Sequence, residues 1–311
     1  LLGYLDADSF LGGKMKLDRA AAEKAIQTHL ADPLGISATE AAWGVHETVT
    51  ANMAQAATIH AIERGLDATR FAMLPIGGAG PVHACSMAQK MGIGCLICPS
   101  GAGVASAIGM LAAAKSFELG RAAPAELSVL DFAKAAELLR EMAGEAAALV
   151  ANAGAGEAEV TQRFSAMMRY LGQGYEIEVP VTLEMVERQD HDGLLENFSE
   201  SYCNRYGRSE DMPAELLSWR LAVTGERSTL GDTLGQRAVV GAAAPASRAT
   251  RPVWFDDAYV EAPVYKRADF GTGSRIDGPA IIEENESTLV LPTGFQLNVD
   301  EALNLILEAA S

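Results

Sequence analysis

A glycine-rich run from Gly77 to Gly80, followed by Pro81 and His83, is the part of the sequence best suited to hold a ligand. Glycines let a backbone approach a ligand closely, and proline suits the start of a helix because its missing N–H is one that the helix leaves unpaired. The helix N-terminus would then offer N–H groups to a phosphate or a nucleotide sugar. A tight turn between a strand and a helix, with no ligand, explains the same residues equally well.

The run is not the fingerprint of dinucleotide-binding proteins, because His83 stands where that fingerprint has its third glycine. His83 falls in the first turn of the expected helix, where the helix dipole disfavours the imidazolium and keeps the ring neutral. It could then donate a hydrogen bond to a ligand oxygen. A histidine that packs against the loop is the alternative.

Other residues with reactive side chains give weaker signals. Cys95 and Cys98 lie in an apolar run typical of a strand, where alternation points them to opposite faces, so we interpret both as reduced core thiols. His29, His46 and His60 lack the spacing of metal ligands, and we interpret them as structural or surface residues. Acidic side chains in the C-terminal region could hold a divalent ion or be solvated: Asp256, Asp257, Glu283, Glu284 and Glu286.

The charge balance limits the partners. The 41 acidic residues outnumber the 24 lysines and arginines, for a net charge of -17, and there is no basic cluster. Nucleic acid and anionic membrane surfaces are therefore not expected partners. No apolar run reaches the roughly 18 residues of a membrane span, and the N-terminus does not resemble a signal peptide, so we expect a cytoplasmic protein.

The elements around the glycine run begin with two helices. Asp18 is the expected N-cap of a helix over residues 19–30 that stops at Pro33 and Gly35. Ser37 and Glu40 form a capping box, which opens a long helix that ends at Gly65. Its spacing predicts one buried stripe: Ala42, Val45, Val49, Met53, Ala56 and Ile59.

The glycine run then lies within a repeated pattern. A strand over 71–76, a helix over 82–91, a strand over 95–98, a loop over 100–103 and a helix over 104–115 follow in order. This order predicts a parallel sheet with crossover helices. Both glycine loops should lie together at the carboxyl ends of the strands, where such sheets bind ligands.

The rest of the chain predicts an α+β unit and a β-rich end. Its elements are a helix over 128–152, strands over 159–171 and 175–183 joined by a Gly172–Gly174 hairpin turn, a helix over 192–206 and a strand over 216–224. Residues 169–175 suit either a ligand-facing hairpin or plain cross-strand pairing. A linker or mobile loop is expected over 227–250, and then strands that end in a short helix from Asp300.

Four passages together resemble the hydantoinase A and 5-oxoprolinase family, whose ATP-dependent members also include nucleotide-using subunits of acetone-type carboxylases. These passages are residues 5–18, residues 71–85 with 99–109, the turn over residues 169–176, and residues 278–283 with 287–288. They occur in the family's order over nearly the whole chain.

The resemblance implies an α/β fold in which part of an actin-like ATPase lobe precedes an α+β unit and a β-rich C-terminal region. The expected boundaries are 1–120, 121–226, a linker over 227–250, and 251–311. It also implies ATP and a divalent metal, with Mg²⁺ expected. The adenosine side of ATP would lie on Gly77, Gly78, Ala79, Gly80 and, by its position, His83.

The family's Asp-x-Gly-Gly-Thr phosphate loop does not occur here, since Gly12 and Gly13 are followed by Lys14. The chain therefore resembles the C-terminal part of a longer subunit, and we expect it to be inactive by itself. The family's chemistry is ATP-coupled opening of a cyclic amide. The alternatives are the ATP-using subunit of an acetone-type carboxylase, or a non-catalytic fragment that docks a hydantoinase B-type partner subunit.

Overall fold

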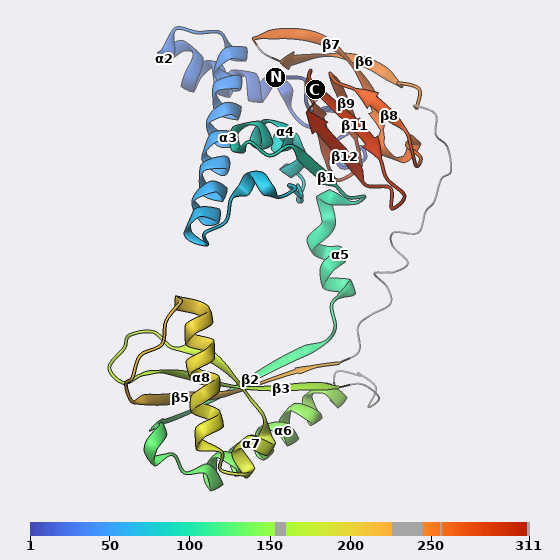
Figure 1. Ribbon diagram of the computed structural model, residues 1–311. Coiled ribbons are helices and arrows are strands. Elements are labelled where there is room, and N and C mark those ends of the chain that lie inside the picture. The colour runs from blue at the N-terminus through green and yellow to red at the C-terminus, as the bar shows by residue number, and fades with distance from the viewer. Residues whose placement is uncertain (153–159, 226–244, 256, 310–311) are drawn as a thin grey trace. The chain divides into compact units, whose positions relative to one another are not determined.

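The computed structural model describes residues 1–152, 160–225, 245–255 and 257–309 (Figure 1). The chain forms two compact units, one of Leu1–Leu111 with Leu230–Ser311 and one of Ala112–Thr229. The C-terminal strands thus belong to the same unit as the glycine run. Most of the expected linker over 227–250, and Asp256, lie outside the described residues.

The helices at the start of the first unit follow from their caps. Asp18 accepts a hydrogen bond from the Ala21 amide and opens α1 (Arg19–Ile26), which continues through a π-helical turn (Gln27–Ala31) into α2 (Asp32–Leu34). The capping box of Ser37 and Glu40 is present at the start of α3 (Ala38–Glu63). The buried stripe on α3 differs from the expected one and consists of Ala41, His46, Thr50 and Ala54.

The expected parallel sheet is wrong. Residues 71–76 form no strand, and their one parallel pairing is the bridge between Met73 and Leu96. The helix α4 (Gly80–Met91) and the strand β1 (Cys95–Cys98) are present, but β1 pairs antiparallel with β12 (Leu305–Ala309). After the second glycine loop the chain enters α5 (Ala105–Ala112).

Two four-stranded sheets complete the first unit. One has the order β1-β12-β11-β8, with β11 at Phe295–Val299 and β8 at Arg275–Asp277. The other has the order β10-β9-β7-β6, from β6 (Ala249–Phe255), β7 (Ala258–Lys266), β9 (Ala280–Glu283) and β10 (Thr288–Leu291). The short helix expected from Asp300 is also wrong, because a turn there leads into β12.

The core of the first unit positions the glycine run. Ala84, Cys85 and Ala88 on one face of α4 pack in a cluster with Leu96 of β1 and with buried residues of β9 to β12. A second cluster joins Leu2 and Tyr4 of the N-terminal segment to β6, β7 and β9. Both ends of the chain therefore hold α4 in place.

The second unit is an antiparallel sheet with helices. The sheet has the order β2-β5-β3-β4, from β2 (Ser116–Glu126), β3 (Thr161–Tyr170), β4 (Ile177–Val181) and β5 (Ala214–Thr224). Its helices are α6 (Phe132–Asn152), α7 (Leu183–Glu187) and α8 (His191–Tyr206), and Trp219 of β5 is fully buried among them. The hairpin of β3 and β4 was expected, whereas β2 was not.

No helix among the residues that the structure describes combines the length and the hydropathy of a membrane-spanning segment.

Candidate functional site

A cavity of about 700 Å³ lies in the first unit and is lined by segments that are distant in the sequence. They are the N-terminal stretch from Leu5 to Gly13, the start of α4 with Gly78, Ala79 and His83, the loop at Gly103 and Val104, and residues 283–288 between β9 and β10. This volume lies within the usual range of small-ligand sites.

The two glycine loops meet at this cavity, as the sequence predicted. The Gly77 amide donates to the Ala102 carbonyl at 2.8 Å, and Gly77 has a φ of 89°, which favours glycine. A Cβ on Gly78 would lie 3.3 Å from the Glu286 carbonyl oxygen, and one on Gly103 only 2.4 Å from it. Gly78 and Gly103 therefore let both loops approach the backbone at Glu286.

The first turn of α4 opens onto the cavity. Ala79 is the N-cap residue, with helical φ and ψ, and it is exposed, whereas Pro81 occupies the second helical position rather than the first. The described structure has no side-chain cap at this end: the Gly80 amide donates to the Gly77 carbonyl at 3.2 Å and the Val82 amide to the Ala79 carbonyl at 3.1 Å, while Pro81 has no N–H. An anion or a polar ligand would therefore meet the positive end of the helix dipole here.

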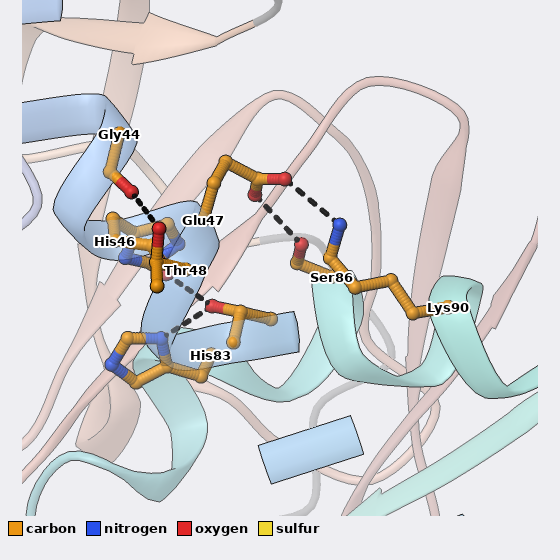
Figure 2. Close-up of polar contacts among 8 residues, drawn as sticks. Gly44, His46, Glu47, Thr48, His83, Ser86 and Lys90 are labelled. Carbon is orange, nitrogen blue, oxygen red and sulfur yellow. Dashed lines mark hydrogen bonds and ion pairs between the residues drawn. The ribbon is translucent and has the colours of Figure 1, made fainter. Parts of the chain in front are cut away.

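His83 reaches the cavity from α4 and contacts α3 on its other side. Its Nδ1 lies 2.9 Å from the Thr50 hydroxyl, and its ring stacks on His46 with centroids 4.4 Å apart (Figure 2). Burial lowers the pKa of His83. For His46, burial and then the neighbouring His83 lower the pKa to about 4. Both rings are neutral at neutral pH.

A second cavity of about 320 Å³ lies on the His46 side of this pair. Tyr4, Trp43 and Phe255 give it aromatic walls, and Trp43 stacks on His46 at 5.4 Å. Its polar rim holds the ion pair between Lys90 and Glu47, whose Nζ and Oε2 are 2.8 Å apart. Figure 2 shows this ion pair beside the two histidines.

Two of the five acidic residues considered for a metal are engaged in contacts within the protein. Glu283 pairs with Arg251, and Glu284 accepts hydrogen bonds from the Gly101 amide at 3.3 Å and the Ser287 hydroxyl at 3.0 Å. Within the described parts of the chain, no group of three or more potential ligands can hold a metal ion. A metal bound by this chain's residues alone does not fit the site.

The cysteines behave as thiols rather than as ligands. Cys85 and Cys98 are buried, which raises the pKa of both, that of Cys98 to about 11. Cys95 is half-buried, and exposure alternates along β1, so Cys95 and Cys98 point to opposite faces. The exposed thiol is that of Cys203.

Side chains at the turn after β3 form contacts with neighbouring elements of the second unit. Arg169 Nε lies 2.7 Å from Glu215 Oε1, the Tyr170 hydroxyl accepts from the Glu210 amide at 2.8 Å, and Gln173 Nε2 donates to the Tyr202 hydroxyl at 3.1 Å. Of the two interpretations left open for this turn, these contacts support structural pairing.

Several residues of the site were missed from the sequence. His46 and Thr50 are one turn apart on α3, so they share a face, but nothing local indicates that this face meets His83. The N-terminal stretch and residues 283–288 reach the cavity only through the folding of both ends of the chain around α4.

An α/β unit in which two glycine loops meet at a large cavity has the features of a small-ligand site, and comparison with known proteins identifies its family. The hydantoinase/oxoprolinase family model matches residues 1–118, and the model of its C-terminal domain matches residues 130–309. The chain belongs to the hydantoinase/oxoprolinase family.

Relatives include two enzyme subunits. The chain is 29% identical to the caprolactamase subunit alpha of Pseudomonas jessenii, over 96% of the chain and 44% of that protein. It is 30% identical to the acetone carboxylase beta subunit of Xanthobacter autotrophicus, also over 96% of the chain and 44% of that protein. The chain thus spans less than half the length of these relatives.

A solved structure has the same fold. A nucleotide-free structure of acetone carboxylase, titled for ATP-dependent acetone carboxylation, matches with a TM-score of 0.76 and 28% identity, over 99% of this chain and 45% of that chain. This match confirms the expected mixed α/β class and agrees with lobes of the actin-like ATPase type.

Proposed function

We propose that this chain forms one nucleotide-facing part of an ATP-dependent enzyme that opens a cyclic amide such as 5-oxoproline or a hydantoin. The observation that carries this proposal is the meeting of the two glycine loops and His83 at one cavity of about 700 Å³. The adenosine side of ATP would lie against Gly77, Gly78, Ala79, Gly80 and His83. The positive end of the α4 dipole and the ammonium of Lys266 would face its polar atoms.

Coupling to ATP suits this reaction because an unactivated amide is hydrolysed slowly. Transfer of the γ-phosphoryl group of ATP to the amide oxygen would activate the amide carbon for attack by water. The C–N bond would then break, with the nitrogen leaving as the protonated amine, and a second water would hydrolyse the resulting acyl phosphate to a carboxylate and inorganic phosphate. Positioning and charge stabilisation supply most of the catalysis in phosphoryl transfer. Mg²⁺ would be bound mainly through ATP phosphates and water, since the described residues form no metal site of their own.

The second candidate function is the ATP-using part of an acetone-type carboxylase. It is favoured by the likeness to the acetone carboxylase beta subunit and to the acetone carboxylase structure. Both candidates include a partner subunit, which we propose is of the hydantoinase B type, because the relatives are named as subunits. A purely docking role for this chain remains the third, non-enzymatic proposal, and a cytoplasmic location stays a prediction.

The nucleotide site is tested best at Ala79. This residue is exposed, lines the cavity and has helical φ and ψ, so a larger side chain fits its backbone without strain. We expect Ala79→Leu to weaken ATP binding at least about tenfold, or roughly 1.4 kcal/mol, in calorimetric titration of the chain. Ala56→Leu on the exposed side of α3 is the matched control and should bind ATP like the wild type.

If the wild type and Ala79→Leu bind ATP with equal affinity and have equal melting temperatures, ATP does not bind in this cavity. To separate the two enzymatic candidates, ATP consumption is compared with 5-oxoproline or hydantoin and with acetone plus bicarbonate. This comparison requires the chain in its assembled enzyme.

A further inference from the structure

The hydroxyl of Thr50 fixes the position of a proton on His83. Thr50 is fully buried in α3, and its Oγ1 lies 2.7 Å from the His46 carbonyl oxygen and 2.9 Å from His83 Nδ1. A carbonyl oxygen can only accept a hydrogen bond, so Thr50 donates its single hydroxyl hydrogen to the backbone carbonyl of His46. Towards His83 the hydroxyl can then only accept, and Nδ1 must carry the hydrogen.

The other ring nitrogen is left with a free lone pair. A neutral imidazole has one N–H, so a hydrogen on Nδ1 makes Nε2 an acceptor. Neutrality is favoured by burial, which lowers the pKa of His83, and by its place in the first turn of α4. Among the described residues no hydrogen bond to Nε2 is found, and Figure 2 shows this nitrogen on the side of the ring away from the Thr50 contact.

We propose that His83 presents Nε2 to the cavity as a hydrogen-bond acceptor and therefore contacts a donor group of the ligand, a hydroxyl or an N–H, rather than a phosphate oxygen. The lone pair of Nε2 and those of a phosphate oxygen repel each other, whereas a ribose hydroxyl or an amide N–H is complementary to it. This reverses the expectation that His83 donates to a ligand oxygen. The choice of ligands rests on the proposed function, but the assignment of the proton does not.

Thr50 is accordingly a positioning residue that acts through His83. Thr50→Val keeps the shape of the side chain and removes the hydroxyl, while Thr50→Ser keeps the hydroxyl and is the matched control. His83→Phe keeps an aromatic ring against His46 but has no acceptor. None of the three changes alters a residue of the glycine loops.

The proton is observed directly by long-range ¹H–¹⁵N correlation spectra of the ¹⁵N-labelled chain at neutral pH. The chain has five histidines, and the signals of His83 are those lost in His83→Phe. We expect a protonated Nδ1 and an unprotonated Nε2 in the wild type and in Thr50→Ser. In Thr50→Val the hydrogen should move, at least in part, to Nε2.

A His83 ring with its hydrogen on Nε2 in the wild type overturns the inference, and so does an unchanged hydrogen on Nδ1 in a folded Thr50→Val. If Thr50→Val does not fold, the spectra of the wild type and Thr50→Ser decide.

The ligand contact is tested by adding ATP, inorganic tripolyphosphate or 5-oxoproline to the labelled chain. We expect ATP or 5-oxoproline to shift the Nε2 resonance, which identifies the nucleoside or the amide as the donor, while tripolyphosphate leaves it unchanged. A shift with tripolyphosphate alone, or binding of ATP and 5-oxoproline without any shift, overturns the donor contact. Failure of the chain to bind ATP counts against the proposed function, whereas the ligand-free spectrum still decides the proton position.

Discussion

His46 and His83 come from different helices and stack nearly parallel, with ring centroids 4.4 Å apart and planes at 15°. His83 lines the larger cavity and His46 the smaller one, so the stacked rings lie between two potential binding spaces. His46 is buried and His83 is half-buried, and burial lowers the pKa of both rings. The stacked pair therefore favours its neutral form.

Acid should destabilise the first unit through His46. Its pKa is about 4 in the folded chain and about 6.5 for an unperturbed histidine, so the unfolded chain binds more protons between these values. Stability is fully present above pH 6.5 and falls as the pH decreases towards 4, by about 2–3 kcal/mol. His83, whose pKa is also lowered, contributes with the same sign.

The measurement is urea denaturation at several pH values for the wild type and His46→Phe. The variant keeps an aromatic ring in the stack and should lose this part of the pH dependence. His60→Gln, an exposed position on the same helix, is the control. Identical pH dependence in the wild type and His46→Phe would show that His46 does not titrate as described.

The thiols should react in the order of their exposure. Cys203 is exposed on α8, whereas Cys85 and Cys98 are buried and their pKa values are raised by that burial. We expect iodoacetamide to modify Cys203 in the folded protein and Cys85 and Cys98 only in urea, as peptide mass mapping would show. Modification of Cys85 before Cys203 in native buffer would contradict the packing of α4.

Local signals in the sequence predicted local structure well. The capping box at Ser37 and Glu40, the cap at Asp18 and the hairpin between β3 and β4 all depend on residues close together in the chain. The prediction of the buried face of α3 was wrong because the many alanines and valines of this helix define no single apolar stripe. Contacts with α4 and with Tyr4 select the face that carries His46 and Thr50.

Pairing between distant segments was not predictable in the same way. The short apolar run of β1 suits a parallel or an antiparallel neighbour, and its partner β12 lies at the other end of the chain. The strand β2 was missed because its half-buried and exposed residues alternate without a strongly apolar face. At the site, the apposition of the two glycine loops was predicted, whereas the contact of Thr50 with His83 depends on how α3 and α4 cross.

The ion pair between Arg169 and Glu215 should matter to the second unit more than a surface pair does. These side chains are 26% and 16% exposed, and Arg169→Met would leave Glu215 without its partner. We expect a loss of about 1–3 kcal/mol in unfolding free energy. The control is Arg188→Met, whose pair with Glu184 is 75% and 67% exposed and should cost less than about 0.5 kcal/mol. Equal effects of the two variants in urea denaturation would contradict this difference.

The 311-residue chain alone should turn over ATP negligibly. It lacks the Asp-x-Gly-Gly-Thr sequence expected to hold phosphates and metal, and the described residues form no metal site. Phosphate release is measured with ATP, Mg²⁺ and either 5-oxoproline or hydantoin. Clear turnover that requires both Mg²⁺ and the chain would contradict this prediction. It would show that residues of this chain alone hold the triphosphate and its metal ion.

Gly103 should be the least replaceable glycine of the two loops. A Cβ there would lie 2.4 Å from the carbonyl oxygen and 2.7 Å from the carbonyl carbon of Glu286, and backbone atoms cannot move aside as a flexible side chain can. We expect Gly103→Ala to cost about 2 kcal/mol in unfolding free energy. The amide of Gly77, which bonds to Ala102 beside it, should exchange its hydrogen faster.

The matched control for this change is Gly94→Ala, because a Cβ on Gly94 meets no atom within 4 Å and its φ is not in the left-handed region. Gly78→Ala should lie between the two variants, since its Cβ would be 3.3 Å from the same carbonyl oxygen. Urea denaturation gives the stabilities, and hydrogen exchange followed by mass spectrometry reports on the loop. If Gly103→Ala is as stable as Gly94→Ala and the Gly77 amide stays protected, the two glycine loops do not close on Glu286 as the structure has them.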